Sequence, residues 1–484
     1  QRLPRPGHPG CLVSARLSAA VEGRLMQRAA LLAFALCVTA PAAWAQQDSD
    51  LDRIPSAVGN ADTVAVGDNN KKSSGKYYLE DDFALSGLRG ALVVPVPGRP
   101  SSRWANSTFL DGVDQWTLAK DLTFDLSDRL GVTEADGVGF PTKAVRNDVR
   151  EAYVSWEPAE RFYLEAGRIN LRNGIALGFN PTDFFKPRTT VSQVSLDPSA
   201  QRENRLGVVM LRGQRIWDGG SLTIAYAPKL YDPSPLANSS GFGLNLDRTN
   251  TADRVEVALN IDVEQLSPQF LVYHDSGRTH FGFNVSRPIG QSIVAYAEWA
   301  GAVEPNDISD AIVFGKKTGT LPSFAPVLPP TSSARTFRND LAAGASWTSE
   351  SEITINLEYH YHQAGFTTQD WRNWFSIGSL GGTQAQELWY VRGVVSDRQQ
   401  PITQQQIFVR ADASDAFVEH LELGVFSLID AYDGSALAQA YASYNISDNW
   451  TAGAYLSGDL GGRRSEWGSY SRETSAIFQV VRYF

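Results

Sequence analysis

Cysteine is nearly absent from this chain. Its 484 residues include only Cys11 and Cys37, and both precede residue 46. The remainder therefore has no thiol, which excludes a disulfide scaffold there and excludes thiolates as nucleophiles or metal ligands.

Long apolar runs and an excess of basic charge are missing as well. After residue 45, no stretch approaches eighteen uninterrupted apolar residues, so we expect no transmembrane helix. Acidic residues outnumber basic ones by 53 to 43, and the formal net charge is −10. Nucleic-acid binding needs a basic footprint and is excluded. Phosphate-binding loops, dinucleotide fingerprints and zinc patterns are also missing, so no cofactor is expected.

The first 45 residues carry an export signal. The short basic start Met26-Gln-Arg precedes the apolar residues 29–38 (AALLAFALCV), and the small-x-small sequence AWA ends at Ala45. This pattern is typical of a secretory signal peptide, which we assign to residues 26–45. We interpret residues 1–25 as upstream sequence translated ahead of the true start. Residues 46–484 hold 38 basic and 52 acidic residues, a net charge of −14.

Alternation of apolar and polar residues dominates the rest of the chain. In residues 254–263 (RVEVALNIDV) and 352–362 (EITINLEYHYH), apolar side chains occupy one face and polar side chains the other. Period-2 patterns of this kind predict half-buried β-strands. Strands of about nine to eleven residues cross a bilayer when they are tilted.

The connections fall into two classes. Brief polar turns occur at residues 157–161, 217–220, 264–267, 287–290, 349–351 and 447–449, and much longer stretches at 168–204, 303–336 and 363–404. Short turns on one side and long loops on the other are typical of outer-membrane barrels. We therefore predict an all-β fold, a transmembrane antiparallel β-barrel of about 16–18 strands over residues 77–484, with short periplasmic turns and long extracellular loops. Residues 46–76 are expected to be a flexible periplasmic lead-in.

The least generic segment begins with EAGRI at residues 165–169. A Gly-rich stretch, NPTDFF (180–185) and a DP…R run (197–205) follow it. This order resembles bacterial outer-membrane barrels of the porin and alginate-export kind. The resemblance implies a loop that folds into the lumen and narrows it, and Phe184 and Phe185 would pin it to the wall. Its candidate lining residues are Arg168, Arg172, Asp183, Arg188, Arg202 and Arg205. The alternative is an ordinary extracellular loop with solvated charges.

Other candidate residues lie on predicted strands. Alternation places the acidic side chains Glu256, Asp262 and Glu358 toward the lumen. His360 and His362 lie two apart on the same face as Glu358 and are weak metal-ligand candidates. Lumen faces are polar by construction, so no metal site is expected.

These features predict a channel in the cell outer membrane of a Gram-negative bacterium. It would pass a polar or anionic solute, or an exported polymer, through a loop-constricted lumen. The alternatives are a surface-anchor or assembly barrel with a plugged lumen and, with less support, an outer-membrane hydrolase. No G-x-S-x-G frame is present, so we predict that the chain is not an enzyme.

The prediction of an outer-membrane barrel also implies binding partners. These are outer-membrane lipid and lipopolysaccharide, the barrel-assembly machinery and, for polymer export, an inner-membrane exporter. The last residues, AIFQVVRYF, resemble the carboxy-terminal assembly signal of outer-membrane proteins. Arg482 stands where that signal prefers an aromatic residue.

Overall fold

A computed structural model describes residues 75–99, 101–136, 145–236 and 241–484. The expected upstream segment, the signal peptide and nearly all of the lead-in lie outside the described residues.

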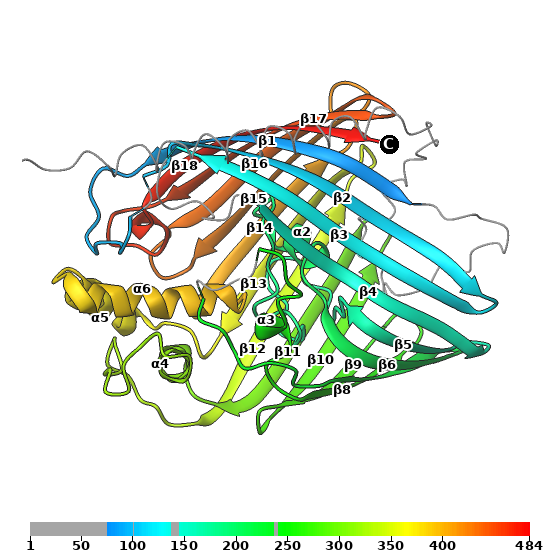
Figure 1. Cartoon of the computed structure of the whole chain (residues 1–484), viewed down its shortest axis with the longest axis horizontal. Coiled ribbons are helices and arrows are strands. Elements are labelled where there is room, and N and C mark those ends of the chain that lie inside the picture. The colour runs from blue at the N-terminus through cyan, green and yellow to red at the C-terminus, as the bar shows by residue number, and fades with distance from the viewer. Residues whose placement is uncertain (1–74, 100, 137–144, 237–240) are drawn as a thin grey trace, which may run out of the picture. The chain divides into compact units, whose positions relative to one another are not determined.

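Eighteen antiparallel strands form one closed sheet (Figure 1). Each strand pairs with its neighbours in sequence, and β1 pairs with both β2 and β18. The prediction of an even-stranded barrel is confirmed. The strands are β1 (Lys76–Leu88), β2 (Trp104–Ala119), β3 (Leu122–Ala135), β4 (Val145–Ala159), β5 (Phe162–Ile169), β6 (Val208–Trp217), β7 (Gly220–Ala227), β8 (Arg254–Ile261), β9 (Gln269–Asp275), β10 (Arg278–Ile289), β11 (Ile293–Glu304), β12 (Thr336–Thr348), β13 (Ile353–His362), β14 (Gln405–Ala413), β15 (Leu421–Asp430), β16 (Ala436–Ser447), β17 (Trp450–Leu460) and β18 (Arg472–Tyr483).

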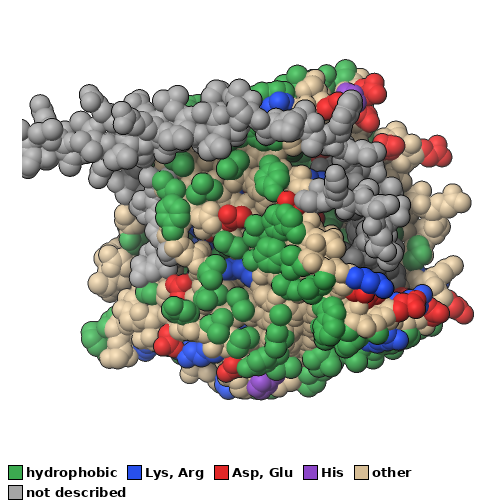
Figure 2. Space-filling model, turned by 45° about the vertical axis from the view of Figure 1, so that its right-hand side comes forward, with side chains coloured by type: hydrophobic (Ala, Val, Ile, Leu, Met, Phe, Trp, Pro, Cys, Tyr) green, Lys and Arg blue, Asp and Glu red, His purple; other side chains and the backbone are tan. Residues whose placement is uncertain are grey.

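The two faces of the wall differ as the alternation predicts. In β13, the Leu357 side chain is 57% exposed, whereas the next residue, Glu358, is 1% exposed. Val255 and Val257 of β8 also point outward, and Glu256 between them is buried. Hydrophobic side chains cover much of the barrel side visible in Figure 2. An apolar outside and a polar inside are the arrangement of a transmembrane barrel.

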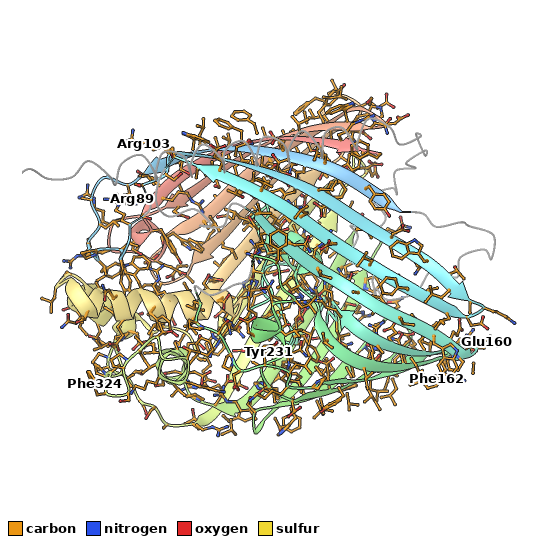
Figure 3. The ribbon with its side chains drawn as sticks, viewed as in Figure 1. Arg89, Arg103, Glu160, Phe162, Tyr231 and Phe324 are labelled. Carbon is orange, nitrogen blue, oxygen red and sulfur yellow. The ribbon has the colours of Figure 1, made fainter. Side chains whose placement is uncertain are left out.

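The two ends of the barrel also differ. The six predicted short turns join β4 to β5, β6 to β7, β8 to β9, β10 to β11, β12 to β13 and β16 to β17. Figure 3 shows Glu160 and Phe162 at this end, and Arg89 and Arg103 at the opposite end. The three long stretches all leave from that opposite end, where they connect β5 to β6, β11 to β12 and β13 to β14. The predicted separation of turns and loops is confirmed.

Helices within the long connections are the main departure from expectation. The sequence predicted an all-β fold in which these stretches are long loops. The structure places α2 (Pro198–Glu203), α4 (Asp307–Lys317), α5 (Thr368–Gly378) and α6 (Gly382–Asp397) in these stretches. The helix α3 (Leu246–Thr249) lies in the β7–β8 connection, and the short 3-10 turn η2 (Trp467–Ser469) lies between β17 and β18.

Local chemistry and packing explain the longer helices. Helix α5 starts with a capping box in which the side chains of Thr367 and Asp370 each accept from the other's backbone N–H. Helices α4, α5 and α6 share a separate apolar core that includes Ile312, Trp374 and Leu388. No helix among the described residues is long and apolar enough to cross a membrane.

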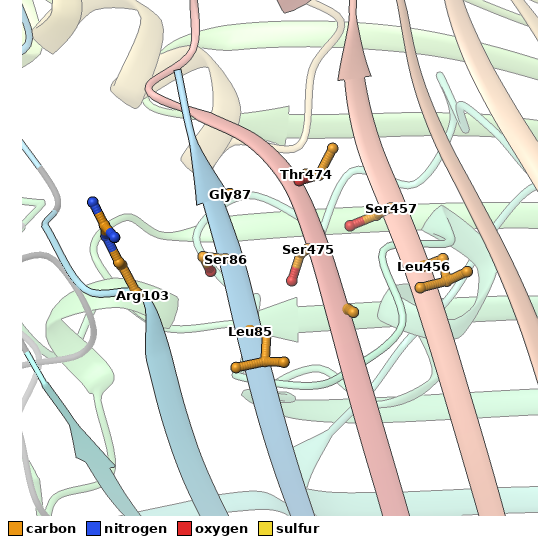
Figure 4. Close-up of a pocket in the computed structure, with 9 residues that line it drawn as sticks. Leu85, Ser86, Gly87, Arg103, Leu456, Ser457, Thr474 and Ser475 are labelled. Atoms are coloured by element: carbon orange, nitrogen blue, oxygen red, sulfur yellow. The ribbon is translucent and has the colours of Figure 1, made fainter. Parts of the chain in front are cut away.

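Strands β1 and β18 close the barrel and pair with each other along most of their length. Tyr78 lies opposite Tyr483, and the register continues without a shift as far as Gly87 opposite Thr474. A cavity of about 570 Å³ lies beside this seam (Figure 4). Small side chains line most of it, and a Cβ atom on Gly87 would come within 2.3 Å of the Thr474 Oγ1 atom. A larger residue at position 87 would therefore require the Thr474 side chain to move.

The outward position of Leu357 can be tested by substitution. Leu357→Arg would place a cation against lipid near the middle of β13, and we expect it to lower the unfolding free energy in vesicles by about 2–4 kcal/mol. Ser351→Arg, in the β12–β13 turn, serves as the control and should unfold like the wild type. Equal stability of both variants in urea titrations would contradict the placement of Leu357 in lipid.

Candidate functional site

The connection between β5 and β6, residues 170–207, runs inside the barrel, and we call it the lumen loop. Its Thr182 hydroxyl is 2.8 Å from the Asn284 side chain of β10, and its Leu196 N–H donates to Gln439 of β16 at 2.9 Å. Asn284 and Gln439 are buried, inward-facing residues. Because β10 and β16 are separated by five strands in the sheet, the loop reaches across the lumen.

Glu298 of β11 holds the first turn of the lumen loop. One oxygen of its carboxylate accepts the N–H groups of Ile175 and Ala176, the latter at 2.5 Å. The other oxygen accepts from the Thr182 hydroxyl at 3.1 Å. Glu298 is fully buried, so these charge-assisted hydrogen bonds replace its hydration.

Glu358 of β13 repeats this arrangement one turn further along. Its two oxygens accept the N–H groups of Leu177 at 2.7 Å and Gly178 at 2.9 Å. The Tyr296 hydroxyl donates to the same carboxylate at 2.6 Å, and His360 Nε2 lies 2.7 Å away. Two wall carboxylates thus bind four consecutive backbone N–H groups of the loop, residues 175–178, and we call the pair the carboxylate clamp.

Two glycines allow the loop to approach the wall this closely. A Cβ atom on Gly174, which has φ +88°, would lie 2.4 Å from a carboxylate oxygen of Glu298. A Cβ atom on Gly178 would lie 2.6 Å from the His360 ring. Any side chain at either position would separate the backbone N–H groups from the clamp.

Aromatic packing fixes the middle of the lumen loop. The Phe184 ring stacks on Tyr273 of β9 at 4.9 Å between centroids, and Phe185 meets the same ring edge-on at 5.6 Å. Both phenylalanines belong to an apolar cluster that includes inward-facing Ala258 and Ala300. The two residues therefore contact the wall as the sequence suggested.

Several candidate lining residues instead form an ion-pair network within the loop. Arg205 donates to both oxygens of Asp183, at 2.8 and 2.9 Å, and both side chains are about 1% exposed. Arg202 donates to the carbonyl of Asn173 at 2.6 Å and lies 3.4 Å from Asp183. Asp183 and Arg205 are closed off from the lumen by these contacts, which shape the loop.

The other three basic candidates, Arg168, Arg188 and Arg172, differ in their burial and contacts. Arg168 is buried and donates to the carbonyl of Leu244. Arg188 pairs with Asp397 of α6 at 3.0 Å. Arg172 is half-buried and makes no hydrogen bond or ion pair within the described residues.

The acidic candidates on strands need correction. Glu256 and Glu358 do point inward, but each is 1% exposed because the lumen loop covers it. Asn173 donates to Glu256 at 2.8 Å. Asp262 lies past the end of β8 in the exposed β8–β9 turn, so it is not on the lumen wall.

The two histidines are held by carboxylates. His360 bonds to Glu358 within the clamp, and His362 lies between Asp307 and Asp340, each 2.8 Å from one ring nitrogen. Within the described ranges, no group of three or more histidine, cysteine, aspartate or glutamate side chains is arranged to hold a metal ion.

Glu298 is the important residue that sequence reasoning missed. It stands alone among apolar and small residues in IVAYAEWAGAV, residues 293–303. An isolated carboxylate on the alternating face of such a strand must point inward, so the signal was available. Its partners are backbone N–H groups about 120 residues earlier, and no local pattern identifies them.

Comparisons with known proteins bear on the fold alone. No protein-family model and no curated protein sequence matches the chain. Among solved structures, Pseudomonas aeruginosa OccK8 (OprE) is similar at 11% identity and a TM-score of 0.48, over 85% of this chain and 98% of that one. Pseudomonas aeruginosa OccK11 (OpdR) is similar at 9% identity and 0.47, over 85% and 96%. Salmonella typhi OmpF, solved with daunomycin, is similar at 10% and 0.40, over 85% and 97%.

The barrel itself decides the location. A closed, even-stranded antiparallel barrel with an apolar outer wall has every strand paired and presents no open edge to lipid. The chain is an outer-membrane β-barrel. The predicted fold class and location are confirmed.

The carboxylate clamp predicts a specific effect of Glu298→Gln. The amide keeps the shape but loses the charge, and its NH2 group faces donors, so we expect the lumen loop to detach from β11. Accessibility of a Val191→Cys label, at a buried position of the loop, should rise, and the unfolding free energy should fall by about 2–4 kcal/mol. Glu160→Gln, in the exposed β4–β5 turn, is the matched control. Unchanged labelling in Glu298→Gln would show that the clamp does not hold the loop.

Lys186 of the lumen loop predicts a pH-dependent stability. Its Nζ donates to the Asn180 carbonyl at 2.7 Å and lies 4.4 Å from the centre of the Phe179 ring. Burial lowers the pKa of Lys186 from 10.5 to about 8. The folded chain therefore binds fewer protons than the unfolded chain between pH 8 and 10.5, and stability rises with pH across this window.

Lys186→Met removes this titration. Below pH 8 the wild type carries a buried ammonium group at a cost of about 3 kcal/mol, and above pH 10.5 that cost is absent. The variant should therefore gain most, relative to the wild type, at pH 7 and lose that advantage near pH 10.5. Parallel urea titrations at the two pH values measure the difference. A constant difference would contradict the lowered pKa.

Proposed function

We propose that the protein is an outer-membrane channel through which small polar or anionic solutes pass by diffusion. The observation that carries the proposal is the lumen loop, which crosses the interior and is bound to β10, β11, β13 and β16. A barrel of eighteen strands is wide enough for an aqueous lumen, and a loop across that lumen narrows it.

The mechanism that this arrangement supports is steric and electrostatic filtering. The clamp and the aromatic contacts keep the loop in one position, so the diameter of the remaining passage is constant. Asp183 pairs with Arg202 and Arg205 within the loop, whereas Arg188 and Asp197 pair with Asp397 and Arg410 outside it. Arg172 keeps an uncompensated positive charge, which favours anions in the passage.

Passage of an exported polymer and the plugged surface anchor remain the competing functions. A polymer exporter would also conduct small ions, whereas an anchor with a plugged lumen would not. Conductance separates the anchor from the channel, and liposome swelling with sugars, amino acids and organic acids separates solutes by class.

Arg172 provides the test of filtering. In planar bilayers under a KCl gradient, we expect steady single-channel current, and Arg172→Glu should shift the reversal potential toward cation preference. Lys120→Glu, an exposed residue at the β2–β3 turn, makes the same charge change away from the loop and should leave selectivity almost unchanged. Absence of steady current in the wild type would exclude the channel and support the plugged anchor. An Arg172→Glu channel with wild-type selectivity would exclude Arg172 from the passage.

A further inference from the structure

Four arginines gather near the loop-bearing end of the barrel, where β4 extends past the end of β5. They are Arg146 of β4, Arg168 of β5, Arg188 of the lumen loop and Arg248 of α3, and we call them the rim arginine cluster. The β7–β8 connection lies over them. The Asn147 N–H donates to the Gly241 carbonyl at 2.7 Å, and Arg248 donates to the Thr190 carbonyl at 3.0 Å. These contacts join three separate segments around one buried position.

Arg168 has hydrogen-bonding capacity that the described chain does not use. Its side chain is 3% exposed, and one Nη group donates to the carbonyl of Leu244. Its Nε and Nη2 atoms are buried and have no hydrogen-bond partner within the described residues. A buried guanidinium N–H without a partner costs free energy, so two on one side chain require an explanation.

Two residues near Arg168 also have buried polar atoms without a hydrogen-bond partner. The Nη2 atom of Arg146 is buried without a partner, although its Nε atom pairs with Asp148 at 2.8 Å. Asn245 directly follows Leu244 and is 3% exposed, and both atoms of its side-chain amide are unpartnered. The unused groups are thus mostly donors, and they lie on segments in contact with one another.

The local charge is positive. Asp148 pairs with Arg146, and Asp397 lies 3.0 Å from Arg188 and 3.7 Å from Arg248. Asp247, half-buried on α3, precedes Arg248 in the sequence. Among the described residues, Asp148 and Asp397 form the ion pairs of the cluster, so its four guanidinium groups outnumber the carboxylates paired with them.

Titration behaviour agrees with this imbalance. Burial lowers the pKa of Arg248 below its ordinary value. Asp397 opposes the shift, while the nearby charges of Arg146 and Arg188 add to it. A group of cations that lower one another's pKa values is stabilised by any anion placed among them.

We propose that the rim arginine cluster binds one oxyanion group, a carboxylate or a phosphate, between Arg168, Arg146 and Asn245. The Nε and Nη2 atoms of Arg168 form one edge of the guanidinium plane. Two parallel N–H bonds on that edge hold both oxygens of such a group. The Arg146 Nη2 and Asn245 amide donors complete the set. The site is separate from the clamp and from Arg172, and it does not depend on the protein being a channel.

The test measures binding to the full chain in detergent by isothermal titration calorimetry with inorganic phosphate. We expect saturable binding, competition by acetate, and an affinity at least tenfold lower for Arg168→Gln, because the bidentate pair is lost. Arg161→Gln, an exposed arginine at the opposite end of the barrel, is the matched control and should bind phosphate like the wild type. Heat-modifiable migration on gels verifies that each variant is folded.

Two further variants have opposite expected signs and protect the test against misfolding of Arg168→Gln. Asn245→Asp adds a negative charge at nearly constant shape and should weaken phosphate binding. Asp148→Asn removes a competing carboxylate and should tighten it. Absence of saturable binding would overturn the proposal and indicate that water alone satisfies the free N–H groups. Equal affinities in Asn245→Asp, Asp148→Asn and wild type would overturn it as well. Conductance measured on the same preparations separates this outcome from failure of the proposed channel.

Discussion

Hydrocarbon offers no hydrogen-bond partner, and this constraint organises the whole molecule. Each backbone group at membrane depth must be paired within the wall, which forces β1 to meet β18 and close the sheet. Once the sheet is closed, the period of two along every strand fixes which side chains face lipid and which face the lumen. Leu357 and Glu358, adjacent in sequence, therefore lie on opposite sides of the wall in environments with opposite requirements.

The same requirement continues inside the barrel. A loop that leaves the wall and enters the interior brings backbone N–H groups that β-pairing no longer satisfies. Glu298 and Glu358 accept hydrogen bonds from four of these N–H groups. Both carboxylates project from paired strands, so the wall fixes their positions. The loop in turn needs glycine at positions 174 and 178, because a Cβ at either position would keep its backbone away from the two carboxylates. Wall and loop are thus two halves of one hydrogen-bonding arrangement.

Features that depend on neighbouring residues could be predicted from the sequence, whereas features that depend on residues far apart in the chain could not. Strands, short turns and long loops were predicted correctly because alternation and turn composition are local properties. Phe184 and Phe185 were also interpreted correctly, since two adjacent large apolar rings in a polar loop must be buried. The helices α4 to α6 were missed because they are stabilised by a core that they build together, with residues such as Ile312 and Leu388 far apart in sequence. The inward direction of Glu358 could be read from its strand, but its function as a clamp could not, because the partners lie about 180 residues away.

Charge inside the barrel divides into two classes with different meanings. Arg205 and Asp183 neutralise each other while buried, and replacing Asp183 would leave the buried charge of Arg205 uncompensated, so the pair contributes to the shape of the loop. A charge that the fold does not neutralise has no such role, and retaining it costs stability. Arg172 and Arg168 belong to this second class, one half-exposed on the loop and one buried at the rim. Sequence alone ranked all these residues together as basic candidates. Their partners, which only the fold supplies, separate the residues that shape the loop from those whose hydrogen-bonding capacity the fold leaves unused.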